Sequence, residues 1–300
     1  MADIDNRLAA APISWGVCEV PGWGHQLAPE RVFSEIASLG IKATELGPIG
    51  YLPFEAPAIR EALDRHDLRL VGGFVPLVLH EPTLDTAEAD KVAAVLAAAG
   101  AEVFNAAVVA DAGWSPPLPL DDDAWKRLAR HLAEVERRVA QHGLTLALHP
   151  HVGTQIETAA DVERALALTE VGWCLDTGHL MIGGTDPAAF ARAHSERVTH
   201  VHLKDIDAAI AAALMGARMS LVEATQAGLF VPLGHGAAGG GRIAETLQAL
   251  DEHGYDGWLV LEQDTAITAD EPAVTSASML AAKQSIAFLN SAHRTEEINR

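Results

Sequence analysis

The sequence is poor in cysteine and in positive charge, and each shortage excludes a class of protein. Cys18 and Cys174 are its only cysteines, too few for a disulfide framework and not spaced as in a zinc ribbon. It has 41 acidic residues against 21 Lys and Arg, a formal net charge of −20. Nucleic acids and anionic membranes bind proteins through a basic footprint, which this composition does not offer. We therefore expect no nucleic-acid or membrane partner, and a reduced, cytoplasmic setting.

Long apolar runs and domain linkers are missing as well. No stretch of about 18 apolar residues is present, as a transmembrane helix would need, and residues 1–5 do not resemble a signal peptide. No low-complexity segment divides the 300 residues, of which 49% are hydrophobic. This is enough apolar material for one large core, so we expect a single domain over residues 1–300.

Short apolar stretches alternate with stretches of helical periodicity. The expected strands cover residues 11–14, 41–45, 68–74, 102–109, 144–149, 172–176, 198–204 and 257–262. The expected helices cover residues 29–39, 57–66, 87–99, 121–141, 158–168, 186–194, 242–253 and 273–290. An extra helical stretch over 207–228, followed by a glycine-rich loop up to residue 240, is predicted as an insertion after the seventh strand. Eight strand–helix units predict an α/β fold of the (β/α)8 TIM-barrel type. The alternative, a doubly wound open sheet, requires a glycine-rich first turn, which residues 14–16 do not provide.

Polar side chains follow most of the expected strands. In a parallel barrel the C-terminal strand ends face the mouth, where catalysis takes place. Reading these ends along the chain gives Trp15, Glu45, Asn105, His149, His151, Asp176, His202, Lys204 and Glu262. Carboxylates mixed with imidazoles suit Mn²⁺, Co²⁺, Zn²⁺ or Fe²⁺ better than Ca²⁺. The pattern predicts a divalent metal site with coordination positions open to substrate oxygens.

Each of these residues also has an ordinary structural interpretation. Asp176 could cap a helix, Glu45 could be a rim carboxylate, and His200 could be a hydrogen-bonded core histidine. Glu262 follows three apolar residues and requires a partner, either a metal or an arginine. The glycine-rich residues 234–241 could bind a phosphate with the help of Arg242, or form a mobile cover over the site.

Several motifs resemble a known superfamily. They are Pro-Ile-Ser-Trp at 12–15, His-Pro-His-Val-Gly-Thr at 149–154, Asp-Thr-Gly-His at 176–179, His-Val-His-Leu-Lys-Asp at 200–205, and residues 254–262. Together they resemble the sugar isomerase/epimerase superfamily with a xylose isomerase-like barrel, and within it the inosose dehydratase-like branch. The resemblance implies a divalent metal, Mn²⁺ or Co²⁺ first and Zn²⁺, Fe²⁺ or Mg²⁺ as alternatives. The implied ligands are His149, Asp176, His202 and Glu262. The superfamily usually has a glutamate where this chain has His149, so His151 or a water is an alternative first ligand.

The resemblance also implies a reaction. A lyase of inositol catabolism would dehydrate a keto-cyclitol or keto-sugar through an enediolate. Its general base would be Glu262 or His149 and its proton donor Lys204 or His179. Trp15, Glu45, Asn105 and His151 would contact the substrate. The alternatives are a ketose 3-epimerase, a hydroxypyruvate isomerase-type enzyme, an endonuclease-type phosphodiesterase, and a non-catalytic partner subunit. A homo-oligomer is compatible with all of them.

Overall fold

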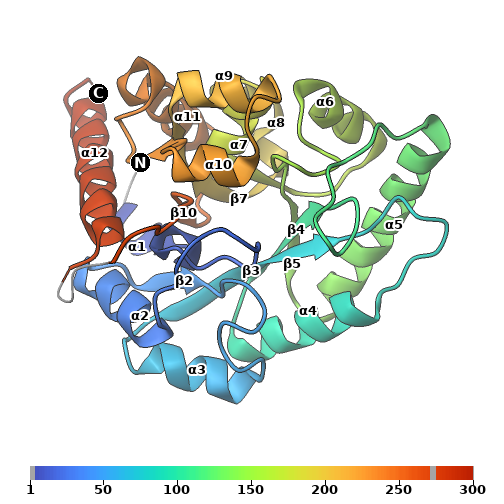
Figure 1. Cartoon of the computed structure of the whole chain (residues 1–300), viewed down its shortest axis with the longest axis horizontal. Coiled ribbons are helices and arrows are strands. Elements are labelled where there is room, and N and C mark those ends of the chain that lie inside the picture. The colour runs from blue at the N-terminus through green and yellow to red at the C-terminus, as the bar shows by residue number, and fades with distance from the viewer. Residues whose placement is uncertain (1–3, 271–274, 300) are drawn as a thin grey trace.

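In the computed structural model, which describes residues 4–270 and 275–299, eight parallel strands close into a barrel (Figure 1). Around the barrel they follow the order β1-β10-β7-β6-β5-β4-β3-β2. Their bounds are β1 Leu8–Ala10, β2 Ala43–Glu45, β3 Arg69–Leu77, β4 Val103–Val108, β5 Thr145–Leu148, β6 Trp173–Asp176, β7 Val198–Leu203 and β10 Leu259–Leu261. Most strand residues are buried, as expected of parallel strands covered on both faces. The predicted (β/α)8 barrel is confirmed.

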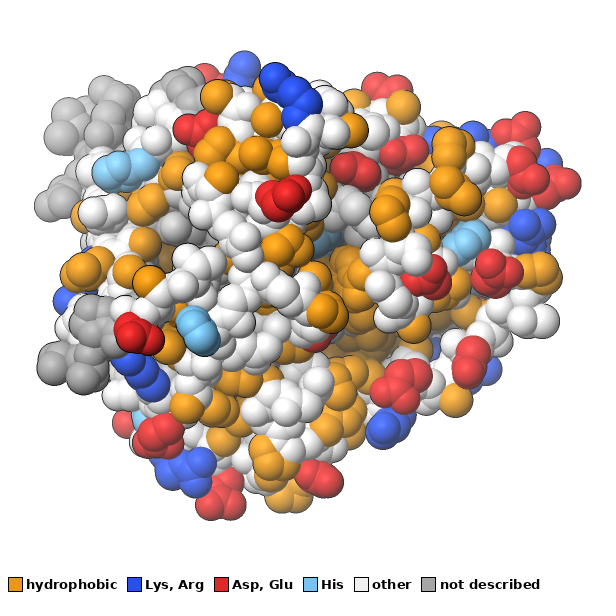
Figure 2. Space-filling model, in the orientation of Figure 1, with side chains coloured by type: hydrophobic (Ala, Val, Ile, Leu, Met, Phe, Trp, Pro, Cys, Tyr) orange, Lys and Arg blue, Asp and Glu red, His pale blue; other side chains and the backbone are white. Residues whose placement is uncertain are grey.

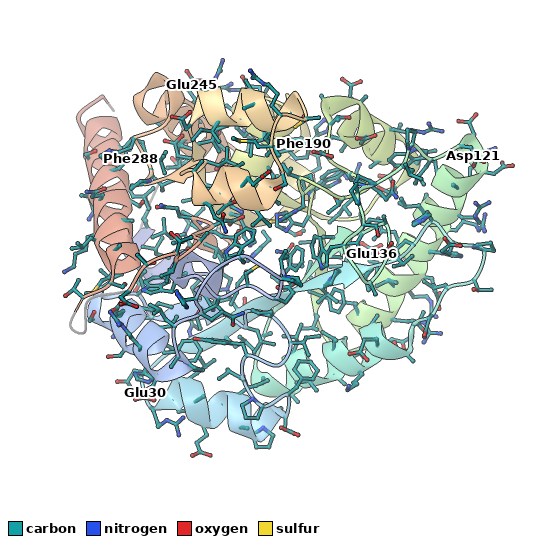
Figure 3. All side chains as sticks on the ribbon, viewed as in Figure 1. Glu30, Asp121, Glu136, Phe190, Glu245 and Phe288 are labelled. Atoms are coloured by element: carbon teal, nitrogen blue, oxygen red, sulfur yellow. The ribbon has the colours of Figure 1, made fainter. Side chains whose placement is uncertain are left out.

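Helices surround the strands (Figure 1). They are α1 Ile4–Arg7, α2 Pro29–Ser38, α3 Ala56–Asp64, α4 Ala87–Ala99, α5 Asp122–Gln141, α6 Ala159–Leu168, α8 Pro187–His194, α11 Gly241–Glu252 and α12 Ala277–Asn299. In α5, Leu128, Leu132, Val135 and Val139 recur at helical spacing and are buried. Asp121 caps α5 by accepting a hydrogen bond from Ala124 N, and Figure 3 shows it at the periphery. No helix within 4–270 and 275–299 combines the length and apolarity needed to cross a membrane.

The first strand was predicted at the wrong place. Residues 11–14 are not a strand; Pro12–Trp15 form the 3-10 turn η1, and the strand precedes them at Leu8–Ala10. Pro12 lacks a backbone N–H for a sheet and suits the first turn of a helix. Gly16, with φ +77°, ends the turn in the left-handed conformation. A strand of three residues gives too little periodicity to be found by pattern.

Helix α7 (Thr177–Gly183) was not predicted, because it has only seven residues, contains Gly178 and begins directly after the sixth strand. The glycine permits a close approach. A Cβ at Gly178 would lie 2.8 Å from Cβ and Cγ of Lys204. Helix α7 therefore packs directly on the end of the seventh strand.

The predicted insertion is present but divided. In place of one helical stretch over 207–228 there are two, α9 (Ala208–Met215) and α10 (Leu221–Gln226), each with its own cap. Asp207 caps α9, and Ser220 forms a capping box with Glu223 at α10. The short antiparallel strands β8 (Asp205–Ile206) and β9 (Phe230–Val231) close the insertion at its base. The predicted start of the last helix at residues 273–274 lies outside the described residues.

Candidate metal centre and cavity

Asp176, His202 and Glu262 meet at the C-terminal end of the barrel. Register explains the meeting: Asp176 pairs with His202 between β6 and β7, and Glu262 directly follows the Leu261–Leu203 pair between β10 and β7. Ligand atoms from these three side chains all lie within 4.8 Å of one another. His202 Nδ1 is 3.6 Å from Asp176 Oδ2 and in direct contact with Glu262 Oε2. All three side chains are buried.

The hydrogen bonding of this cluster is incomplete, and a bound cation would complete it. Within the described residues, buried His202 Nδ1 makes no hydrogen bond, although it touches Glu262 Oε2, which is also ion-paired with Lys204. Buried polar atoms without a partner carry a free-energy cost. Two carboxylates and an imidazole form a donor set suited to a first-row divalent ion. The residues present therefore fit the implied metal.

His149 is the better placed of the two histidines considered for the first ligand position. Its Nε2 lies 3.3 Å from Asp176 Oδ2. His151 instead directs Nδ1 to Val152 O at 2.7 Å and packs its ring on His179, with centroids 3.9 Å apart. Burial lowers the pKa of His149, and burial with the nearby His149 lowers the pKa of His151 to about 3. Both rings are therefore neutral near pH 7.

Glu45 fixes the orientation of His202. Glu45 Oε1 is 3.0 Å from His202 Nε2 and 2.8 Å from His200 Nε2. The Nε2 proton of His202 then points to Glu45, and Nδ1 faces Asp176 and Glu262. Carboxylates behind metal-binding histidines commonly set the tautomer in this way. Burial lowers the pKa of His202, but Cys174, Glu262 and Glu45 outweigh burial and hold the pKa well above its usual range, so a metal that binds Nδ1 would displace a proton. His200 is fully buried and bonded to Glu45, in agreement with the core interpretation.

Lys204 supplies positive charge to the same cluster. Its Nζ lies 3.2 Å from Asp176 Oδ2, 3.2 Å from Glu262 Oε2 and 2.9 Å from Asp264 Oδ1. Burial alone would lower the pKa of Lys204, but these carboxylates outweigh it and hold the pKa well above its usual range. The amine is therefore charged. It faces three carboxylates, so the single positive charge of Lys204 does not neutralise them. A divalent cation would supply the positive charge that is missing.

A cavity of about 430 Å³ opens above this centre. Figure 2 shows a hollow near the middle of this face with hydrophobic side chains around it. The polar side chains at its inner end are Glu45, His149, His151, Glu262 and Asp264. Asp176, His202 and Lys204 are not part of its lining and lie directly behind Glu262.

Some predicted roles do not agree with these positions. The prediction that Trp15 contacts the substrate is wrong, because its ring is fully buried and Nε1 donates to Glu35 Oε2 at 2.8 Å. Asn105 also lies off the cavity wall, with Nδ2 3.3 Å from His202 Nε2 and 3.5 Å from His149 Nδ1. His179 is behind the wall, where Nε2 is 3.1 Å from Lys204 Nζ.

The described part of the glycine-rich residues 234–241 and Arg242, considered for phosphate binding, also do not line the cavity. Arg242 is half-exposed and pairs with Asp186 and Glu245 instead of facing the cavity. The glycine-rich turn is fixed by Asp205, whose Oδ2 accepts hydrogen bonds from Gly234 N and Gly236 N. A phosphate-binding role for Arg242 at this site is not supported.

Asp264 is the residue that the sequence reasoning missed. Its carboxylate lines the cavity and holds Lys204 Nζ. Burial and the neighbouring Glu262 raise the pKa of Asp264 to about 6, although Lys204 opposes the rise. A sequence signal existed, because Asp264 stands two residues after Glu262 and shares its parity along an extended chain.

Comparison with known proteins agrees with the fold. The chain is 32% identical over 270 residues to the rhizopine catabolism protein MocC of Rhizobium meliloti, covering 86% of this chain and 81% of that one. It is 29% identical over 280 residues to an inosose dehydratase of Lacticaseibacillus casei, covering 88% and 90%. Its fold matches an L-ribulose 3-epimerase with a TM-score of 0.67, 18% identity and 97% coverage of both chains.

A second solved structure, the IOLI protein with a bound zinc atom, matches with a TM-score of 0.67, 14% identity and coverage of 95% and 97%. The model of one family, the xylose isomerase-like TIM barrel, matches residues 33–291. The curated relatives include enzymes, and the chain's own donor set fits a divalent ion. The chain belongs to the xylose isomerase-like TIM-barrel family.

Proposed function

We propose that this protein is a divalent-metal-dependent hydro-lyase that removes water from a keto-cyclitol or keto-sugar. One observation carries the proposal: donors from Asp176, His202 and Glu262 lie within 4.8 Å of one another at the inner end of a cavity. Relatives named inosose dehydratase, about as long as this chain, support the reaction class.

The metal would be held by Asp176, His202 and Glu262, with His149 as a fourth ligand, and Mn²⁺ or Co²⁺ is our first choice. When bound, such an ion supplies Lewis-acid polarisation of the substrate carbonyl. Glu45 keeps His202 in the ligating tautomer, and Lys204 offsets the remaining negative charge.

Dehydration requires two proton transfers. A base removes the proton next to the carbonyl, and the released electron pair forms the new double bond. An acid protonates the hydroxyl on the carbon β to the carbonyl, and this hydroxyl leaves as water. Asp264 and His151 line the cavity and are not among the candidate metal ligands Asp176, His202 and Glu262. We therefore assign the proton transfers to Asp264 and His151. Lys204 keeps Asp264 in place through the 2.9 Å contact.

An epimerase or isomerase is the second candidate. The same two groups on the cavity wall favour it, because one can remove a proton and the other can return one without loss of water. The two reactions start alike and differ only in whether the hydroxyl leaves.

A substrate assay tests both. Chelator-treated protein is reloaded with Mn²⁺, Co²⁺ or Zn²⁺ and incubated with 2-keto-myo-inositol. The proposal predicts an ultraviolet-absorbing enone or dione and a mass loss of one water, both dependent on metal. Epimerised ketone of unchanged mass would support the second candidate. No reaction of this ketone or of simple ketoses with any metal would contradict both.

A further inference from the structure

The outer part of the cavity is much less polar than its inner end. Three separate segments supply apolar side chains: the loop after η1, the loop after β4, and the α9–α10 insertion. The contributing residues are Val17, Val20 and Trp23; Trp114, Pro116 and Pro117; and Leu214, Leu221 and Val222. The polar side chains in the outer part are few, mainly Glu19, Glu157 and Ser220.

Such a wall does not suit a ligand that carries a hydroxyl on every carbon. Hydroxyls that face apolar carbon lose hydrogen bonds to water and gain none from the protein. The groups that can hydrogen-bond hydroxyls are concentrated near the metal centre. The cavity thus has one end suited to a polar ring and another suited to an apolar group.

Trp114 marks the boundary between the two ends. Its backbone has φ +58°, an unusual conformation for a bulky residue. The turn is held by Asp111, whose Oδ1 accepts hydrogen bonds from Gly113 N at 2.8 Å and Ser115 N at 3.2 Å. The indole stacks on Phe74, with centroids 6.0 Å apart and planes at 15°, and meets the edge of His151 at 5.9 Å. The turn therefore holds a flat aromatic surface next to a polar residue of the cavity.

We propose that the natural substrate is a keto-sugar or keto-cyclitol bearing an aryl group in ether or glycosidic linkage. The keto ring lies at the polar end, and the aryl group lies against Trp114, in the part of the cavity that Leu221 and Val222 of the insertion also line. Flat rings gain from contact with aromatic and proline side chains, which are abundant in this wall. The inference rests on the proposed function for the position of the keto ring, and on the cavity wall for the substituent.

Binding of unreactive ligands tests the inference separately from catalysis. Phenyl β-D-glucoside, methyl β-D-glucoside and myo-inositol are titrated into the Mn²⁺-loaded wild-type protein by calorimetry. We expect the phenyl glucoside to bind about tenfold more tightly than the methyl glucoside, a gain typical of aromatic stacking with apolar burial. Equal affinities for these glucosides would overturn the inference, whether or not 2-keto-myo-inositol is dehydrated.

Variants identify the surface responsible. Trp114→Ala should abolish the preference for the phenyl glucoside, and Trp114→Phe should retain part of it. Leu118→Ala is the matched control, since Leu118 is 76% exposed in the same loop and does not line the cavity. A preference unchanged in Trp114→Ala would also overturn the inference. Circular dichroism checks that each variant is folded.

Discussion

Nε2 of His202 lies 3.0 Å from Oε1 of Glu45, on the side of the ring opposite Asp176 and Glu262. Glu45 is therefore a positioning residue. Sequence reasoning had expected it to contact substrate, and its side chain does also line the cavity. Its main consequence is that Nδ1 of His202 faces the candidate metal.

Replacing Glu45 should therefore weaken metal binding. Glu45→Ala is expected to lower Mn²⁺ affinity by about 10- to 100-fold, a common effect of removing a carboxylate behind a ligating histidine. Competition with a fluorescent chelator measures the affinity. Glu30→Ala, on the exposed side of α2, is the control (Figure 3). An unchanged affinity in Glu45→Ala would remove the orienting role.

Lys204 should contribute more to the free energy of unfolding in the metal-free protein than in the metal-bound protein. Lys204→Met leaves Asp176, Glu262 and Asp264 buried without their ammonium partner, which should destabilise the metal-free protein by about 3–5 kcal/mol. A divalent ion should restore part of this loss, because it neutralises the same carboxylates. Urea unfolding with excess chelator and with excess Mn²⁺ measures both values. Equal destabilisation under the two conditions would show that the ion and Lys204 do not share these carboxylates.

Gly178 should resist even a small side chain. In Gly178→Ala the added Cβ would lie 2.8 Å from Cβ and Cγ of Lys204, which cannot move away without shifting β7. We expect about 1–3 kcal/mol of destabilisation together with reduced metal affinity. Gly241→Ala is the matched control, since its Cβ would meet nothing within 4 Å. Wild-type stability in Gly178→Ala would mean that α7 and β7 are less tightly packed than described.

Glu35 should make the folding stability depend on pH. Its carboxylate accepts hydrogen bonds from Ser276 Oγ, Trp15 Nε1 at 2.8 Å, Arg31 Nε at 3.1 Å and Ser276 N at 3.2 Å. Burial raises its pKa, but these bonds together outweigh burial and leave the pKa below its ordinary value. A lowered folded-state pKa stabilises the fold above the unfolded value, about 4.3, and the stabilisation is lost as the pH falls through the folded value.

Glu35→Gln should therefore cost about 2 kcal/mol at pH 7, and the difference from wild type should shrink as the pH falls below about 4. Thermal unfolding across this range measures the difference. A cost that does not depend on pH would mean that shape, and not charge, holds α2 to the start of α12.

The sequence predicted the barrel because some helices, such as α5 and α6, have helical periodicity and side-chain caps, and because buried parallel strands are continuous apolar runs. It also predicted the meeting of Asp176, His202 and Glu262, since strand ends of a closed barrel share one rim. Trp15 was misassigned because the three-residue first strand was shifted by a proline turn. Asp264 was missed because it stands three residues beyond the end of β10, and its shared parity with Glu262 was not used. Trp114 was missed because its position depends on a left-handed turn that composition does not reveal.

The central claim is that Asp176 holds a divalent ion at the barrel mouth. Protein reloaded with Mn²⁺ and dialysed is analysed for metal by mass spectrometry, for wild type, Asp176→Asn and Asp207→Asn. Asparagine retains helix capping, so both variants should fold; Asp207, which caps α9, controls for the capping role that Asp176 has at α7. The account predicts bound Mn²⁺ in wild type and in Asp207→Asn and its loss in Asp176→Asn. Metal-free wild-type protein, or undiminished Mn²⁺ in Asp176→Asn, would contradict it.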